Sequence, residues 1–367
     1  MPLNPLQPGA TIGIFGGGQL GRFLAIAASK LGLRAQIYAP EEDNPAFQVA
    51  SGRYVASYAD EAALERFAKS CDVITFEFEN VPARTLEIAA QHCPVRPGAR
   101  AAAIAQDRIA EKRFLTDAGL PVAPQAVIGK PGDLPAAAAF LEKAGRAILK
   151  RSREGYDGKG QARVSTAAEL EAAFADLGAK PCVLEAMLDF SMEISVIGVR
   201  AADGCMSFYD CPENDHKGGI LRTSSVPARC TQEHQRLAKE MAGRIADALH
   251  YCGVLAVEFF VMPEGAPEPV LVNEIAPRVH NSGHWTMDAC AISQFENHIR
   301  AVAGWPIGTP ARHSDAAMTN LLGEDVLHWQ DILQQDPGSS IYLYGKADVR
   351  AGRKLGHVTR ISPLTAK

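Results

Sequence analysis

The stretch Leu255–Thr286, LAVEFFVMPEGAPEPVLVNEIAPRVHNSGHWT, places one acidic residue inside each of two apolar strands. Glu258 lies within LAVEFFV and Glu274 within VLVNEIA, and the Pro/Gly-rich connection lets the strands pair antiparallel. Side chains facing each other across paired strands lie about 5 Å apart, close enough to share metal ions. A buried acid pair without a cation would repel itself, so the pattern predicts a magnesium site that also binds nucleotide phosphates.

The composition is that of a globular protein of two or three domains. Its 367 residues are 47% hydrophobic and 22% charged, and the formal net charge is -5. This charge does not favour a nucleic-acid surface, so an anionic substrate must meet a local cluster of cations.

The amino-terminal residues lack the basic and apolar regions of a secretory signal, and no apolar run is long enough to span a bilayer. The eight cysteines form no CxxC pair. We therefore expect a cytoplasmic protein with reduced thiols that binds neither nucleic acid nor membranes.

Strands and helices alternate along the first hundred residues. Strands are predicted over 11–15, 35–39 and 73–78, with helices over 20–31 and 61–69, and this order implies a parallel sheet. One further helix is predicted over 100–120. Near the carboxyl end, a strand pair is predicted around 341–345 and 357–361.

The turn after the first strand carries GxGxxG, formed by Gly16, Gly18 and Gly21, and the acidic run Glu41–Asp43 follows the second strand. The literal interpretation is a nicotinamide dinucleotide site of an oxidoreductase. The alternative is a tight turn whose helix N-terminus binds another phosphate or nothing. The rest of the chain favours ATP.

A glycine-bearing loop follows the strand that ends at Lys150. The chain has no GxxxxGK[ST] motif, but RSREGYDGKGQ places Gly155, Gly158 and Gly160 beside Lys159, which suits close contact with phosphates. Such a loop can also close as a lid that excludes water. The alternative is an ordinary hairpin with solvated lysines.

Two more acids end or interrupt apolar strands. Glu185 ends one strand, and Glu193 lies within MEISVIG. A strand end with free backbone groups and a carboxylate suits an adenine edge and a ribose diol. Considered alone, Glu185 is better interpreted as a surface carboxylate.

Together, Lys150, GYDGKG, Glu185, Glu193, Glu258 and Glu274 resemble the ATP-grasp superfamily. More narrowly, the segments FGGGQLGR, GYDGKGQ, GILRTS, NEIAPRVHNSGHWT with SQFENH, and YGKADVRAGRKLGH are similar to the N5-carboxyaminoimidazole ribonucleotide synthetases of purine biosynthesis. The resemblance runs from about residue 11 to about residue 357.

The resemblance implies an α/β and α+β architecture. It consists of a Rossmann-like parallel-sheet domain over 1–97, an ATP-grasp domain over 98–300 with a mobile lid over about 121–185, and a small β-rich domain over 301–367. The family also implies a homodimer.

The resemblance further assigns the site residues. Those implied to line the ATP site are Arg108, Lys150, Gly155, Tyr156, Asp157, Gly158, Lys159, Gly160, Gln161, Glu185, Ala186, Met187, Leu188, Glu193, His216, Asn273 and Glu274. The implied magnesium ligands are Glu258 and Glu274. The implied catalytic residues are Asp157, which would orient the amine, and Arg278, His280 and Asn281, which directly follow the metal site.

The implied reaction carboxylates 5-aminoimidazole ribonucleotide with bicarbonate and ATP, through carboxyphosphate. The residues implied to bind the ribonucleotide are Gln19, Glu77, Tyr156, Lys159, Arg278, Lys346, Arg353 and Lys354. The last three would hold its phosphate, although alone they suit a solvated basic turn. The nearest alternative is another ATP-grasp carboxylase or amine ligase, which would lack the NSGHW and GRK segments.

Overall fold

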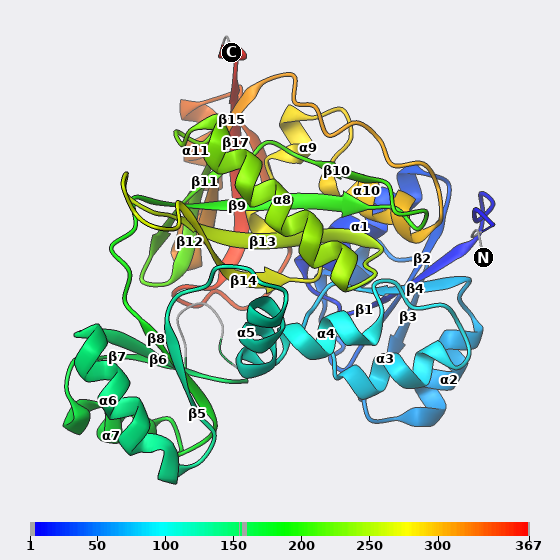
Figure 1. The fold of residues 1–367 in the computed structure, drawn as a ribbon. Coiled ribbons are helices and arrows are strands. Elements are labelled where there is room, and N and C mark those ends of the chain that lie inside the picture. Colours follow the sequence, from blue (N-terminus) through cyan, green and yellow to red (C-terminus); the bar gives the residue numbers. More distant parts are fainter. Residues whose placement is uncertain (1–3, 154, 156–159, 366–367) are drawn as a thin grey trace.

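The computed structural model describes residues 4–153, 155 and 160–365 and contains three β-sheets (Figure 1). The first sheet has the order β3-β2-β1-β4, and all its neighbouring strands are parallel, as predicted. Its strands are β1 (Thr11–Phe15), β2 (Arg34–Ala39), β3 (Gly52–Val55) and β4 (Val73–Phe76). We did not predict β3, because its four residues alternate between half-buried and exposed and form no apolar run.

Five helices accompany this first sheet and the segment after it. They are α1 (Gln19–Lys30), α2 (Glu61–Lys69), α3 (Ala83–Ala90), α4 (Ala99–Ala105) and α5 (Arg108–Asp117). The prediction of one helix over 100–120 is wrong. Asp107 divides it, because its side chain accepts hydrogen bonds from the N–H groups of Ile109 and Ala110 and so caps a new helix.

The second sheet is small and antiparallel, in the order β5-β8-β6-β7. Its strands are β5 (Gln125–Ile128), β6 (Ala147–Arg151), β7 (Gln161–Val164) and β8 (Cys182–Ala186), with helices α6 (Leu134–Ala144) and α7 (Ala167–Asp176). Lys150 pairs with Gln161, so the predicted loop between these strands begins one residue after Lys150, at the end of β6.

The third sheet has nine strands, in the order β14-β13-β9-β11-β12-β15-β17-β16, with β10 paired to β9. Its strands are β9 (Met192–Arg200), β10 (Met206–Phe208), β11 (Glu213–Lys217), β12 (Ile220–Val226), β13 (Gly253–Val261), β14 (Val270–Ala276), β15 (Asp315–Leu322), β16 (Ser340–Leu343) and β17 (Lys354–Ser362). The predicted carboxyl-terminal strand pair is confirmed as β16 and β17. These strands extend the same sheet through β15, and the division into domains stays a prediction.

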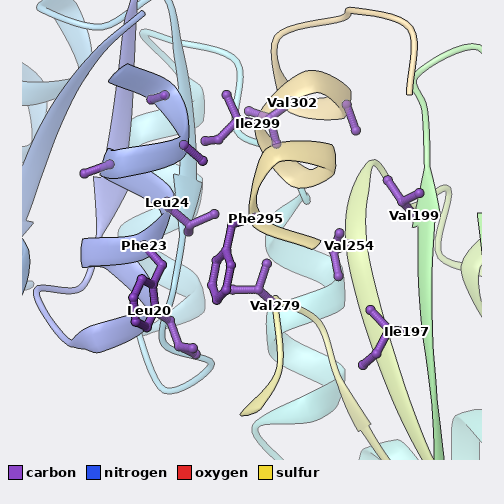
Figure 2. Packing of buried hydrophobic residues seen from close by; sticks show 14 of the residues in the cluster. Leu20, Phe23, Leu24, Ile197, Val199, Val254, Val279, Phe295, Ile299 and Val302 are labelled. Atoms are coloured by element: carbon purple, nitrogen blue, oxygen red, sulfur yellow. The ribbon is translucent and has the colours of Figure 1, made fainter. Parts of the chain in front are cut away.

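Helices cover this large sheet: α8 (Gln232–Ala248), α9 (Thr286–Ala289), α10 (Gln294–Val302) and α11 (Trp329–Gln335). Within the described part of the chain, no helix combines the length and apolarity needed to cross a membrane. The helix α10 connects two sheets (Figure 2). Phe23 of α1 faces Phe295 of α10, and α10 also packs against β9 and β13.

The residues at this junction are fully or almost fully buried, including Phe295, Ile299 and Val254. Burying one side chain of this size contributes about 2 kcal/mol. The first and third sheets therefore share one apolar core, which fixes the first sheet against the site described below.

Candidate active site

Acidic and polar side chains form a row across one face of the large sheet. Glu274 of β14 lies opposite Glu258 of β13, and Glu258 lies opposite Ser195 of β9. Glu193 is two residues before Ser195 and so points to the same face. The predicted antiparallel pairing of the two acid-bearing strands is confirmed.

The two carboxyls have opposite electrostatic surroundings. Burial and the charge of Glu274 raise the pKa of Glu258 to about 7. The pKa of Glu274 is lowered, because the charges of Arg108 and Lys150 outweigh the effect of its partial burial. Arg108 donates a hydrogen bond to Glu274 at 3.2 Å. A carboxylate at Glu258 is thus costly without a nearby cation.

The surroundings of Glu258 suit a divalent cation. One ligand atom each from Glu193, His216 and Glu258 lie within 4.8 Å of one another. His216 Nδ1 lies 2.8 Å from a carboxylate oxygen of Glu193, which places this predicted residue at the site. Magnesium prefers carboxylate and phosphate oxygens, so Glu258 and Glu274 fit it better than His216 does.

A buried acid between two lysines lies next to this row. Glu185 is 3% exposed, with Lys150 Nζ at 2.7 Å and Lys112 Nζ at 3.4 Å from its two oxygens. These lysines hold the pKa of Glu185 at about 2 despite burial. The pKa of Lys150 is itself lowered, since burial outweighs the attraction of Glu185. The interpretation of Glu185 as a surface carboxylate is wrong.

The helix α5 supplies site residues that sequence reasoning missed. In Figure 1 this helix lies between the small sheet and β14. Lys112, 1% exposed, also donates to the carbonyl of Asn273 at 2.8 Å, and Glu111 accepts the N–H of Ile275 at 2.5 Å. The spacing of Arg108, Glu111, Lys112 and Leu115 on one helix face is the signal that was available.

The segment after β8 is the predicted adenine hinge. The N–H groups of Ala186 and Met187 donate to the carbonyls of Pro124 and Arg146, both at 2.9 Å. These two N–H groups are therefore already hydrogen-bonded within the protein. Leu188, which is half-buried, has no hydrogen bond from its N–H to another described residue.

The segment after β14 turns back over the acidic row. Arg278 forms a partly buried ion pair with Glu79 of the amino-terminal region. His280 Nε2 lies 3.5 Å from Glu258 Oε1. The Asn281 side chain exchanges hydrogen bonds of 3.0 and 2.6 Å with Asn320, so its amide is engaged within the protein. Arg278 and His280 thus reach the predicted site, while Asn281 contributes to its framework.

The glycine turn of the first sheet binds a carboxylate of the chain itself. Glu77 accepts the N–H groups of Gly18 at 2.9 Å and Gly21 at 3.2 Å. A Cβ on Gly16, whose φ is +103°, would lie 2.6 Å from Glu77 Oε1. Because this acid occupies the amides that would hold a dinucleotide phosphate, the nicotinamide interpretation is wrong. Gln19 begins α1 beside this turn.

The predicted basic residues near the carboxyl end have different surroundings. Lys346 donates to the carbonyl of Lys354 at 2.9 Å. Arg353 donates to the carbonyl of Asp348 at 2.9 Å and lies 3.5 Å from its carboxylate. Lys354 lies nearer the acidic row, since its positive charge acts to lower the pKa of Glu258.

Four predicted residues, Tyr156, Asp157, Gly158 and Lys159, lie outside the described residues. Gly155 and Gly160, on either side of them, are half-buried. The assignments of individual site residues stay predictions.

The chain matches known families along nearly its whole length. The ribonucleotide synthetase preATP-grasp domain matches residues 9–106, the ATP-grasp domain residues 113–295, and the phosphoribosylaminoimidazole carboxylase C-terminal domain residues 316–367. N5-carboxyaminoimidazole ribonucleotide synthase of Brucella melitensis is 48% identical over 367 residues, covering 100% of both chains. That of Bacillus subtilis is 41% identical, covering 96% of this chain and 92% of its own.

The chain belongs to the N5-carboxyaminoimidazole ribonucleotide synthase family. The solved Staphylococcus aureus enzyme complexed with ADP has a TM-score of 0.92 and 36% identity, covering 98% of this chain and 95% of its own. The Aspergillus clavatus enzyme, in complex with ADP and 5-aminoimidazole ribonucleotide, has a TM-score of 0.89 and 29% identity, covering 97% and 94%. The predicted ATP-grasp fold and ATP-dependent ligase activity in purine biosynthesis are confirmed.

Proposed function

We propose that this chain joins bicarbonate to the amine of 5-aminoimidazole ribonucleotide with the hydrolysis of ATP. Bicarbonate is a poor electrophile until one of its oxygens becomes a phosphate ester. The first step transfers the γ-phosphoryl group of ATP to bicarbonate, giving carboxyphosphate and ADP. In the second step the amine nitrogen bonds to the carbonyl carbon, directly or after release of carbon dioxide, and phosphate leaves.

One observation carries the proposal: Arg278 and His280 follow Glu274 directly and turn back over Glu258, so a cation and a hydrogen-bond donor meet the acidic row. The acids suit magnesium, and the donors suit an anionic oxygen. When bound, magnesium would be held by Glu258 and Glu274 and would neutralise the triphosphate.

The partly buried cations Lys150 and Arg108 on the other side of the row suit the nucleotide. Lys150 and Arg108 carry positive charge into the site with side chains that are only 13% and 19% exposed. Glu185 and Glu274 orient these cations and keep their charges compensated until phosphates arrive. Loop residues Gly155–Gln161, which include Asp157 and Tyr156, would cover the reactive intermediate and approach the aminoimidazole.

The ribonucleotide would bind between the first sheet and the carboxyl-terminal strands. Gln19 and Glu77 would face it from the first sheet, and Lys346, Arg353 and Lys354 would hold its phosphate. We also propose a cytoplasmic homodimer; the eight free cysteines suit a reducing compartment, and the dimer follows from the family.

The test measures ADP release by the purified chain with magnesium and ATP. We expect release to require both bicarbonate and 5-aminoimidazole ribonucleotide, with one N5-carboxylated product per ADP. If the ribonucleotide gave no stimulation, or if another amine replaced it equally well, the proposed substrate would be wrong.

A further inference from the structure

A buried chain of hydroxyl and amide groups leads away from His280 into the large sheet. Ser282 Oγ lies 2.8 Å from His280 Nδ1 and 2.7 Å from Ser195 Oγ. Asn214 Nδ2 lies 3.1 Å from Ser195 Oγ, and Ser224 Oγ lies 2.7 Å from Asn214 Oδ1. Ser195, Ser224 and Ser282 are 0% exposed and Asn214 is 6% exposed.

The strand register explains why these groups meet. Ser195 lies opposite Glu258, and Asn214 of β11 lies opposite both Glu193 of β9 and Ser224 of β12. The polar row of the sheet face therefore continues past the acids through Ser195, Asn214 and Ser224. Ser282, on the segment after β14, covers Ser195 and connects this row to His280.

The direction of these hydrogen bonds follows from one group that can only donate, a backbone N–H. The backbone N–H of Ser282 donates to His280 Nδ1 at 3.3 Å. A nitrogen that accepts a hydrogen bond cannot also carry a hydrogen in the neutral ring. The remaining bonds then run in one direction, from Ser224 to Asn214, Ser195, Ser282 and finally His280 Nδ1. In this arrangement each hydroxyl donates one hydrogen bond, and those of Ser195 and Ser282 each also accept one.

We propose that Ser282, Ser195 and Asn214 are positioning residues that hold His280 as its Nε2–H tautomer, so that His280 is a fixed hydrogen-bond donor toward the reacting anion and not the base that takes the amine proton. The lone pair of the ring is committed to Ser282. Its Nε2 lies 3.5 Å from Glu258 Oε1, at the acidic row.

This inference rests on the proposed function for the identity of the anion, which is bicarbonate or the carboxylate formed from it. A fixed donor stabilises developing negative charge without reorganising during the reaction. A base at this position would instead need its lone pair on Nε2, and the buried chain would then lose its acceptor.

The tautomer can be observed without substrate. In the ¹⁵N-histidine-labelled full chain, the signals of His280 are identified by their loss in His280→Asn. At pH 8 we expect a proton-bearing, pyrrole-like Nε2 and a pyridine-like Nδ1, with the Nδ1 signal displaced in Ser282→Ala. A pyrrole-like Nδ1 in the unsubstituted chain would overturn the inference.

Kinetics supply the second readout. Losing one hydrogen bond to the ring should lower kcat/KM for bicarbonate about tenfold in Ser282→Ala, with KM for ATP changed less than about twofold. Ser195→Ala should act in the same direction, and Ser195→Thr, which keeps the hydroxyl, should restore most of the rate. Unchanged bicarbonate kinetics in both alanine variants would overturn the inference.

The control is Thr359→Val, because Thr359 is 1% exposed and its hydroxyl has no hydrogen-bond partner among the described residues. Like the Ser282→Ala substitution, Thr359→Val removes a buried hydroxyl, but it should leave the His280 spectrum and the bicarbonate kinetics unchanged. The two proposals fail differently. No ADP release with the ribonucleotide in the unsubstituted chain contradicts the proposed function, whereas the spectrum of His280 tests the tautomer regardless of substrate.

Discussion

Arg278 and Glu79 are joined by two hydrogen bonds although they lie 199 residues apart in the chain. Arg278 Nε and Nη2 donate to the two carboxylate oxygens of Glu79, the second at 2.9 Å. Glu79 follows β4 of the first sheet, and Arg278 follows β14 of the third. The Arg278 charge lowers the pKa of Glu79 in spite of burial. This pair therefore fixes the first sheet against the acidic row.

Glu79→Gln should leave the Arg278 charge partly uncompensated. We expect a loss of about 2 kcal/mol in the free energy of unfolding, because removing one partner of this partly buried pair leaves the other charge without its counterion. The kcat/KM for the ribonucleotide should also fall, because Glu79 would no longer hold Arg278 in place. Urea unfolding and steady-state kinetics measure both effects.

The matched control for this prediction is Glu87→Gln, which disrupts a pair between Glu87 and Arg84 whose side chains are both exposed. Exposed pairs contribute little, so this variant should change stability by less than about 0.5 kcal/mol. Equal effects of the two substitutions would show that the pair with Arg278 has no special structural role.

Part of this site could be predicted from patterns of residues that lie close together in the sequence. Glu258 and Glu274 each interrupt an apolar strand, and the short connection lets the two strands pair, so residues close in sequence were enough to predict that they meet. The parallel order of the first sheet was predictable for the same reason. The break at Asp107 was missed because an N-cap residue inside a helical pattern resembles an ordinary polar position.

Contacts between distant segments made the rest unpredictable. Lys112 looks like a solvated charge on a helix, and only its contact with the Asn273 carbonyl, 161 residues away, shows otherwise. Ser195 lies in an apolar strand, where a small polar residue has no distinctive meaning until Ser282 covers it. Glu77 fills the glycine turn through the pairing of β1 with β4, which the glycines alone do not reveal.

Glu111→Gln should make stability less sensitive to pH. Burial raises the pKa of Glu111 from 4.5 to about 7, outweighing the charges of Lys112 and Arg108. Below pH 4.5 the group is protonated in both folded and unfolded chains, and stability is lost as the pH rises through 7. Glutamine resembles the protonated acid and does not titrate. The free energy of unfolding of the variant, relative to the unsubstituted chain, should therefore rise by up to about 3 kcal/mol from pH 4.5 to pH 8.

Urea unfolding at pH 5 and pH 8 measures this difference. Glu142→Gln is the control, because Glu142 is an exposed residue of α6 and its substitution should give no pH-dependent change. A stability difference for Glu111→Gln that is the same at both pH values would contradict the raised pKa.

Glu258→Gln and Glu274→Gln should abolish turnover, because each removes a proposed magnesium ligand. Glu258→Gln should also raise the Tm of the metal-free chain at pH 8, since it removes a buried charge that Glu274 repels. Chelation of magnesium should stop ADP release in the unsubstituted chain, and excess magnesium should restore it.

Glu268→Gln is the control in the same hairpin, since Glu268 lies in the exposed connection between β13 and β14. Its rate and Tm should be those of the unsubstituted chain. Turnover by Glu274→Gln would refute the metal role of this acid.

Lys354→Ala and Arg353→Ala should differ, although the residues are adjacent. The Lys354 charge acts on Glu258, Glu79 and His280, so it lies within the site. Arg353 bonds to Asp348 on an exposed turn. Losing a charge-assisted contact should raise KM for the ribonucleotide about tenfold in Lys354→Ala, with KM for ATP nearly unchanged.

In Arg353→Ala we expect a smaller increase, because the guanidinium must leave Asp348 before it can bind a phosphate. Initial rates over a range of ribonucleotide concentrations, at saturating ATP and bicarbonate, separate the two variants. If Arg353→Ala raised KM as much as Lys354→Ala, both side chains would contact the ribonucleotide phosphate and the turn would rearrange on binding. If neither substitution raised KM for the ribonucleotide, its phosphate would bind elsewhere.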